Sequence, residues 1–178
     1  MNLISTLLLG HLIADFPLQT NWVYKWKCRS SAGVAFHVAI HLGVTALLIR
    51  EPLRHWPLLA TLGLAHFITD WLKLRLTSPV QTPGFLLDQT AHIAAILIIA
   101  RSAPGTAIVL PPVLLYPALL YATVPAAMTL TWVFANDVGQ EIENAGDWIQ
   151  VARRQMLSLA QLAGFPLLMA VTIARITL

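Results

Sequence analysis

One spacing of polar residues recurs four times within the apolar runs of the first half of the chain. The four pairs are His11 and Asp15, His37 and His41, His66 and Asp70, and Asp88 and His92. Two side chains four positions apart share one face of a helix. An Asp at the centre of a membrane helix costs about 2.5–3.5 kcal/mol on insertion scales, so such pairs need a reason to be there. Their recurrence predicts a metal site with several ligands inside a helix bundle.

The composition predicts an all-α integral membrane protein. Of the 178 residues, 57% are hydrophobic and only 11% are charged, whereas a soluble domain is about 25% charged. A membrane helix takes about 20 apolar residues. We therefore expect residues 1–178 to form a single transmembrane domain, a bundle of about six transmembrane helices. The expected helices cover about 3–19, 33–49, 57–76, 85–100, 113–134 and 156–176.

Two connecting segments have distinct compositions. Pro17 lies two residues after Asp15, so we expect a kink or an early end of the first helix there. The basic segment that follows interleaves Lys25 and Lys27 with aromatic residues, which is typical of a loop at the membrane interface. Between about 137 and 153, apolar residues recur at helical spacing with acids first and arginines last. This pattern predicts a short interfacial helix.

The Lys and Arg residues give an expected orientation. Arg50, Arg54, Arg101 and Arg175 lie on one side of the expected bundle, and Lys25, Lys27, Arg29, Lys73, Arg75, Arg153 and Arg154 lie on the other. The positive-inside tendency places the larger set in the cytoplasm and both termini on the outer side. A bacterial inner membrane is the expected location. The modest net charge of +3 indicates membrane topology rather than nucleic-acid binding.

The alternation of the expected helices places the four polar pairs at one depth. The pairs of the first and third helices come late in their segments, and those of the second and fourth come early. Because odd and even helices run in opposite directions, all four pairs fall in the same half of the membrane. Unrelated polar pairs would not have to share a depth, so their agreement favours a common site.

Imidazoles and carboxylates without thiolates suit zinc, manganese or iron. The single cysteine, Cys28, excludes a thiolate cluster. The expected ligands number more than one tetrahedral ion requires, so two divalent ions could share them, or some could form a second layer around one ion. Lys73 follows Asp70 by three residues on the same helix face, where it could hold an anionic group. The ligands that we predict are His11, Asp15, His37, His41, His66, Asp70, Asp88 and His92.

The motifs resemble those of a family of small bacterial multi-spanning membrane proteins catalogued as a domain of unknown function. They read His11-x-x-x-Asp15-Phe16-x-Leu18-Gln19, His37-x-x-x-His41, His66-x-x-x-Asp70-x-x-Lys73 and Asp88-Gln89-x-x-His92. The layout is also loosely similar to that of membrane-bound metal-dependent hydrolases. The resemblance covers the first half of the chain and implies the membrane fold and the motif set.

We expect a metal-dependent hydrolase of a phosphorylated or esterified substrate at the membrane surface. In this hypothesis the ion activates a water and Lys73 acts as the catalytic group that stabilises the anion. One alternative is a carrier or sensor of divalent ions, and another is an accessory subunit of a larger membrane complex. A proton relay or plain structural hydrogen bonds would also use such pairs. The expected partners are membrane lipids, including an anionic lipid or phosphorylated substrate, and further copies of the chain.

Overall fold

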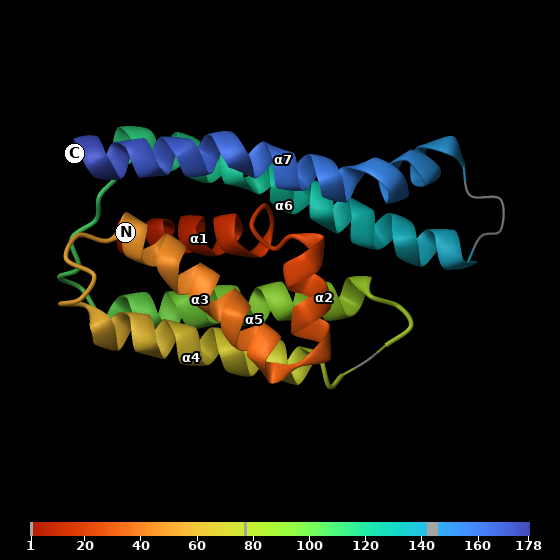
Figure 1. Ribbon diagram of the computed structural model, residues 1–178, viewed down its shortest axis with the longest axis horizontal. Coiled ribbons are helices and arrows are strands. Elements are labelled where there is room, and N and C mark those ends of the chain that lie inside the picture. The colour runs from red at the N-terminus through yellow and green to blue at the C-terminus, as the bar shows by residue number, and fades with distance from the viewer. Residues whose placement is uncertain (1, 77, 142–145) are drawn as a thin grey trace.

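The computed structural model describes residues 2–76, 78–141 and 146–178, and the described part of the chain is all-helical with seven helices (Figure 1). They are α1 (Asn2–Asp15), α2 (Asn21–Arg29), α3 (Ser31–Leu48), α4 (Trp56–Lys73), α5 (Thr82–Ser102), α6 (Pro112–Glu141) and α7 (Asp147–Thr177). Helices α1, α4, α5, α6 and α7 run roughly along the long axis of the molecule, α3 runs obliquely to it and α2 lies across it, and both termini lie at the same end. Successive long helices therefore alternate in direction.

Helix α1 is the centre of the bundle. Leu7, Leu9 and Ile13 on this helix are fully buried. Leu9 and Ile13 belong to an apolar cluster that includes residues of α3, α6 and α7. Leu7 belongs to a second apolar cluster, with residues of α4 and α5. His11 and Asp15, near the end of α1, therefore lie where other helices must approach them.

The early end of the first helix that Pro17 predicts is confirmed: α1 ends at Asp15, because Pro17 cannot donate the hydrogen bond that would continue it. The chain turns at residues 16–20, and the basic segment that we expected to be a loop is helix α2. Thr20 caps α2 by accepting a hydrogen bond from the Val23 N–H, and Ser30 caps α3 by accepting one from the Gly33 N–H. These two caps fold α2 back across the end of the bundle.

The expected interfacial helix at about 137–153 is not a separate element in the described residues. Its first residues continue α6 to Glu141, and its last residues are the start of α7 at Asp147. The polar groups there pair with each other, since Arg153 donates to the Asn136 side chain and Trp132 donates to the Arg153 carbonyl. The α6–α7 hairpin forms the most extensive helix–helix contact of the fold.

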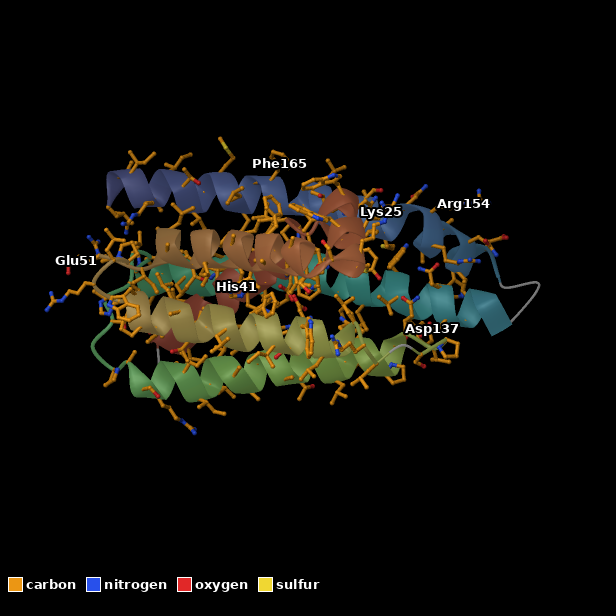
Figure 2. All side chains as sticks on the ribbon, turned by 60° about the horizontal axis from the view of Figure 1, so that its bottom comes forward. Lys25, His41, Glu51, Asp137, Arg154 and Phe165 are labelled. Atoms are coloured by element: carbon orange, nitrogen blue, oxygen red, sulfur yellow. The ribbon has the colours of Figure 1, made fainter. Side chains whose placement is uncertain are left out.

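Within the described residues, four helices are long and apolar enough to cross a membrane: α3, α5, α6 and α7. Helix α1 has only 14 residues, and α4 has 18 but carries His66, Asp70 and Lys73. The outward faces of the bundle carry many large apolar side chains, of which Leu120, Phe165 and Leu87 are among the most exposed. In Figure 2, His41 lies in the interior, between Glu51 at one end of the molecule and Asp137 and Arg154 towards the other.

Candidate metal centre

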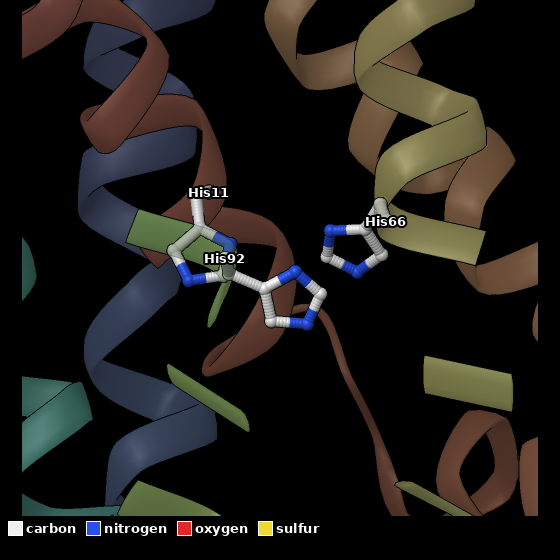
Figure 3. Close-up of side chains that lie close together, drawn as sticks. All are labelled: His11, His66 and His92. Carbon is white, nitrogen blue, oxygen red and sulfur yellow. The ribbon is translucent and has the colours of Figure 1, made fainter. Parts of the chain in front are cut away.

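The eight predicted ligands converge in one buried cluster. Helices α1, α3, α4 and α5 each contribute one pair, and none of the eight side chains is more than slightly exposed. Figure 3 shows the rings of His11, His66 and His92 facing one another from three different helices. The ring centroid of His66 lies 4.1 Å from that of His92 and 4.3 Å from that of His41. The i, i+4 spacing therefore predicted the convergence correctly.

Three donor atoms in this cluster lie at the corners of a small triangle. His37 Nε2 is 3.1 Å from Asp15 Oδ1 and 3.1 Å from His66 Nε2, and His66 Nε2 is 3.4 Å from Asp15 Oδ1. A zinc-like ion bound at 2.0–2.1 Å with tetrahedral angles would separate neighbouring donors by about 3.3 Å. The triangle therefore fits one face of a tetrahedral site with three protein ligands.

Hydrogen bonds alone do not satisfy this triangle. A neutral imidazole has one N–H and one lone pair, and a carboxylate has only lone pairs. If the Nε2 atoms of His37 and His66 both carried hydrogens, the two hydrogens would repel each other across 3.1 Å. If one of these nitrogens carried no hydrogen, its lone pair would be repelled by the Asp15 carboxylate. A cation at the centre is attracted to all three atoms. Asp70 Oδ2 adjoins the same imidazoles, 3.4 Å from His66 Nε2 and 3.7 Å from His37 Nε2.

Two further groups of three donors lie close enough to hold an ion. One contains His11, His66 and His92, and the other contains Asp70, Asp88 and His92. His41 belongs to none of the three groups, although its ring lies beside those of His11 and His66. Both of its ring nitrogens are buried and have no hydrogen-bond partner in the described residues. Orphaned polar atoms of this kind are rare in proteins and indicate that the cluster lacks a component.

Two lysines neutralise two of the three carboxylates. Lys27 Nζ lies 2.7 Å from Asp70 Oδ1, and Lys73 Nζ lies 2.6 Å from Asp88 Oδ2. No lysine or arginine among the described residues pairs with Asp15, whose charged neighbours are the histidines. With neutral imidazoles the cluster carries one net negative charge. Of the three groups, only the triangle of Asp15, His37 and His66 contains a carboxylate without a lysine partner.

The structure adds Lys27 to the site, which the sequence reasoning missed. The composition predicts an interfacial loop for this segment and gives Lys27 no role in the site, but Lys27 is buried whereas Lys25 is exposed. Val23 and Lys27 share one face of α2, and both are buried, so the i, i+4 spacing was a usable signal. Gln89 also belongs to the cluster: its amide lies 3.1 Å from His11 Nε2 and 3.4 Å from Asp15 Oδ2.

Lys73 lies at the edge of the cluster rather than inside it. Its side chain is about one-third exposed (34%), and its ammonium group also lies 5.5 Å from the centre of the Phe85 ring. From there it faces a cavity of about 350 Å³. The polar wall of the cavity includes Asp15, Lys27 and Asp88, so the cavity connects the cluster with the surface. Lys73 is therefore positioned between the candidate metal centre and any molecule in this cavity.

Residues 3–115 match a family model described as "Protein of unknown function (DUF3307)". No curated protein and no solved structure matches the chain. The matched region contains all eight residues of the cluster together with both lysines. It ends near the start of α6, so most of the α6–α7 hairpin lies beyond it.

Proposed function

The chain belongs to the DUF3307 family, and we propose that it is a membrane-embedded, metal-dependent hydrolase. In this proposal about six helices cross a bacterial inner membrane. The cluster holds a divalent transition metal, and the substrate is a phosphorylated or esterified molecule at the membrane surface. The observation that carries the proposal is the triangle of Asp15, His37 and His66. Its three donor atoms are spaced as the ligands of one metal ion would be, and Asp15 is the one carboxylate of the cluster without a lysine partner.

The membrane assignment is supported by the length and apolar surface of four helices. We propose that α1 and α4 complete the set of six because they lie in the same bundle and run along the same axis (Figure 1). Both termini would then lie on one side, which we take to be the outer side.

The charge of the cluster favours one ion over two. A single divalent ion would change the net charge of the cluster from one negative to one positive, which one bound anion neutralises. Two divalent ions would leave three positive charges in a buried site, and burying unpaired charge is costly. We therefore propose one zinc, manganese or iron ion at Asp15, His37 and His66. Three protein ligands would leave a position open, as in catalytic zinc sites.

Such an ion, when bound, lowers the pKa of a coordinated water to about 7 and polarises a phosphoryl or carbonyl oxygen. The protein residues have separate roles. The Lys73 ammonium, held by Asp88, donates hydrogen bonds to the anionic oxygens of the substrate. Gln89 fixes the orientation of Asp15 and His11 through its amide. Lys27 keeps the Asp70 charge compensated, so that Asp70 can remain ionised beside the histidines.

A carrier of divalent ions is the second function to weigh, because it would use the same ligands. A carrier needs a polar path from its site to both sides of the membrane. Beyond the cluster, towards the end that holds the N-terminus, the space between the helices is filled by apolar residues. Leu7, Ile49, Leu58 and Leu62 belong to this apolar cluster, and all four are buried. The described residues therefore favour a site that opens to one side. An accessory or structural role in a larger complex would not require the cavity beside Lys73, so the cavity favours the hydrolase over this role.

Hydrolysis by the purified protein tests the proposal. Metal-loaded protein in nanodiscs is offered a panel of phosphorylated and esterified lipids, and release of phosphate or acid is measured with and without chelator. We expect chelator-sensitive turnover that Lys73→Gln lowers by about tenfold or more, because a charged donor to the anion is lost. Gln can still donate to Asp88, so bound metal and thermal stability are retained. The exposed Lys25→Gln is the matched control and should keep full turnover.

Two results would contradict the proposal. One is a metal-loaded, folded protein that hydrolyses no member of the panel. The other is Lys73→Gln protein with the turnover of the wild type. Stable co-purification with another membrane protein, combined with no turnover, would favour the accessory role instead.

A further inference from the structure

The cavity beside the cluster is lined by both charged and apolar side chains. Its polar lining includes Asp15, Asp88 and Gln89 and the two lysines of the cluster. Its apolar lining includes Phe16, which follows α1, Phe85 of α5 and the hairpin residues Trp132, Val133 and Leu157. A ligand that contacts both kinds of lining must therefore be an amphiphile.

The polar lining of the cavity favours an anion. An ammonium group has three N–H donors. Lys73 donates one to Asp88, and Lys27 donates one to Gln19 while lying beside Asp70. Each lysine therefore retains at least one N–H for a ligand. A phosphate offers several acceptor oxygens, and its charge suits a site that would become positive on binding a divalent ion.

The size of the cavity restricts the apolar part of the ligand. Its volume of about 350 Å³ is at the small end of the range for small-molecule sites, which is about 300–1,000 Å³. A headgroup and the first part of one hydrocarbon chain would occupy it. The apolar wall formed by Trp132, Val133 and Leu157 comes from the α6–α7 hairpin, which lies outside the region that matches the family model.

We propose that this cavity binds a single-chain amphiphile with a terminal phosphate. The phosphate lies at Lys27 and Lys73, and the chain lies along Phe85 and the hairpin wall of Trp132, Val133 and Leu157. As a statement about substrate class, the inference rests on the proposed hydrolase function. As a statement about binding, it stands on the cavity alone. A free phosphate ester would leave the apolar wall in contact with water, and a cationic headgroup would meet two ammonium groups.

Photolabelling tests the binding directly. The protein is placed in nanodiscs of zwitterionic lipid with a long-chain alkyl phosphate that carries a photoreactive group on its chain. The labelled residues are then mapped by peptide mass spectrometry, with and without chelator. We expect labels on α6 and α7 at the wall residues Trp132, Val133 and Leu157. A phosphocholine with the same chain should label these positions about tenfold less, because its phosphodiester carries less negative charge than a terminal phosphate and its quaternary ammonium group is repelled by the two lysines.

A matched pair of variants separates the cavity from the lipid-facing surface. Leu157→Trp fills space in the cavity beside the hairpin wall and should lower the labelling of α6 by about tenfold. Leu159→Trp places the same side chain on the exposed surface of α7 two residues away and should leave labelling unchanged. Equal labelling by the two headgroups, or labels confined to outward residues such as Leu120 and Phe165, would overturn the inference.

The same experiment distinguishes this inference from the hydrolase proposal. Specific labelling of the wall without turnover of any phosphorylated lipid would support the binding site and contradict the hydrolase. Turnover of short, water-soluble phosphate esters at the same rate as long-chain ones, without wall labelling, would support the hydrolase and contradict the amphiphile.

Discussion

The ion pair between Lys27 and Asp70 gives the sharpest prediction about the stability of the cluster. The nitrogen and oxygen lie 2.7 Å apart, and their side chains are 6% and 0% exposed. Lys27→Met keeps the length of the side chain but removes its charge, which leaves the Asp70 carboxylate buried without its nearest cation. Removing one partner of a buried ion pair costs about 3–5 kcal/mol. We therefore expect the unfolding equilibrium constant to rise by roughly two to three and a half orders of magnitude.

The measurement is equilibrium unfolding in mixed micelles of increasing SDS fraction, followed by circular dichroism on chelator-treated protein. Lys25→Met is the matched control, since Lys25 is exposed on the same helix. It should change the free energy of unfolding by no more than about 0.5 kcal/mol. The double variant Lys27→Met/Asp70→Asn removes both charges and should be more stable than Lys27→Met alone.

Equal stability of the Lys27→Met and Lys25→Met proteins would refute this reasoning. A double variant that is less stable than Lys27→Met would also refute it, because the cost would then not arise from an uncompensated carboxylate.

Two further substitutions test the packing that positions the cluster. Gly33→Ala would place a Cβ 2.3 Å from the backbone of Trp26 and should lower the free energy of unfolding by about 1–3 kcal/mol in the same assay. The control Gly43→Ala, on the same helix, meets nothing within 4 Å and should be neutral or raise the free energy of unfolding by about 0.5–1 kcal/mol. Equal effects of the two substitutions would contradict the close contact of α2 with α3. Asp137 accepts hydrogen bonds from the backbone N–H groups of Gln81 and Thr82 at the start of α5, at 2.8 and 2.6 Å. Asp137→Ala should therefore cost about 1–2 kcal/mol and increase hydrogen exchange at the first turn of α5, and unchanged exchange there would contradict the cap.

The sequence predicted the cluster because its signal is local. A spacing of four residues places two side chains on one helix face, and alternating helix directions place the four pairs at one level. The choice of Asp15, His37 and His66 as the closest triangle could not be predicted in this way. It depends on how far α1, α3 and α4 rotate about their axes, and packing of the apolar clusters sets that rotation.

Other features were missed because long-range contacts override local composition. The segment with Lys25 and Lys27 has the composition of an interfacial loop, yet the caps at Thr20 and Ser30 make it a helix whose buried face carries Lys27 to Asp70. The polar run at the end of α6 and the start of α7 also has the sequence pattern of an interfacial helix.

The polar residues at the end of α6 and the start of α7 instead form contacts between these two long helices. A Cβ at Gly139 would lie 2.8 Å from the Arg153 guanidinium, so glycine provides the space that Arg153 occupies. Arg153 also donates to Asn136. Amphipathic spacing alone does not distinguish a helix that lies on a membrane from one that pairs with a neighbour.

Metal content tests the central claim most directly. Protein purified in detergent without chelator is analysed for transition metals beside His37→Ala, with Lys25→Met as the control. We predict about one ion per chain in the wild type and in the control, and almost none in folded His37→Ala protein, since His37 supplies one of three ligands. A well-folded wild type that contains no metal and takes up none on addition of zinc, manganese or iron would contradict the account, and so would His37→Ala protein with undiminished metal.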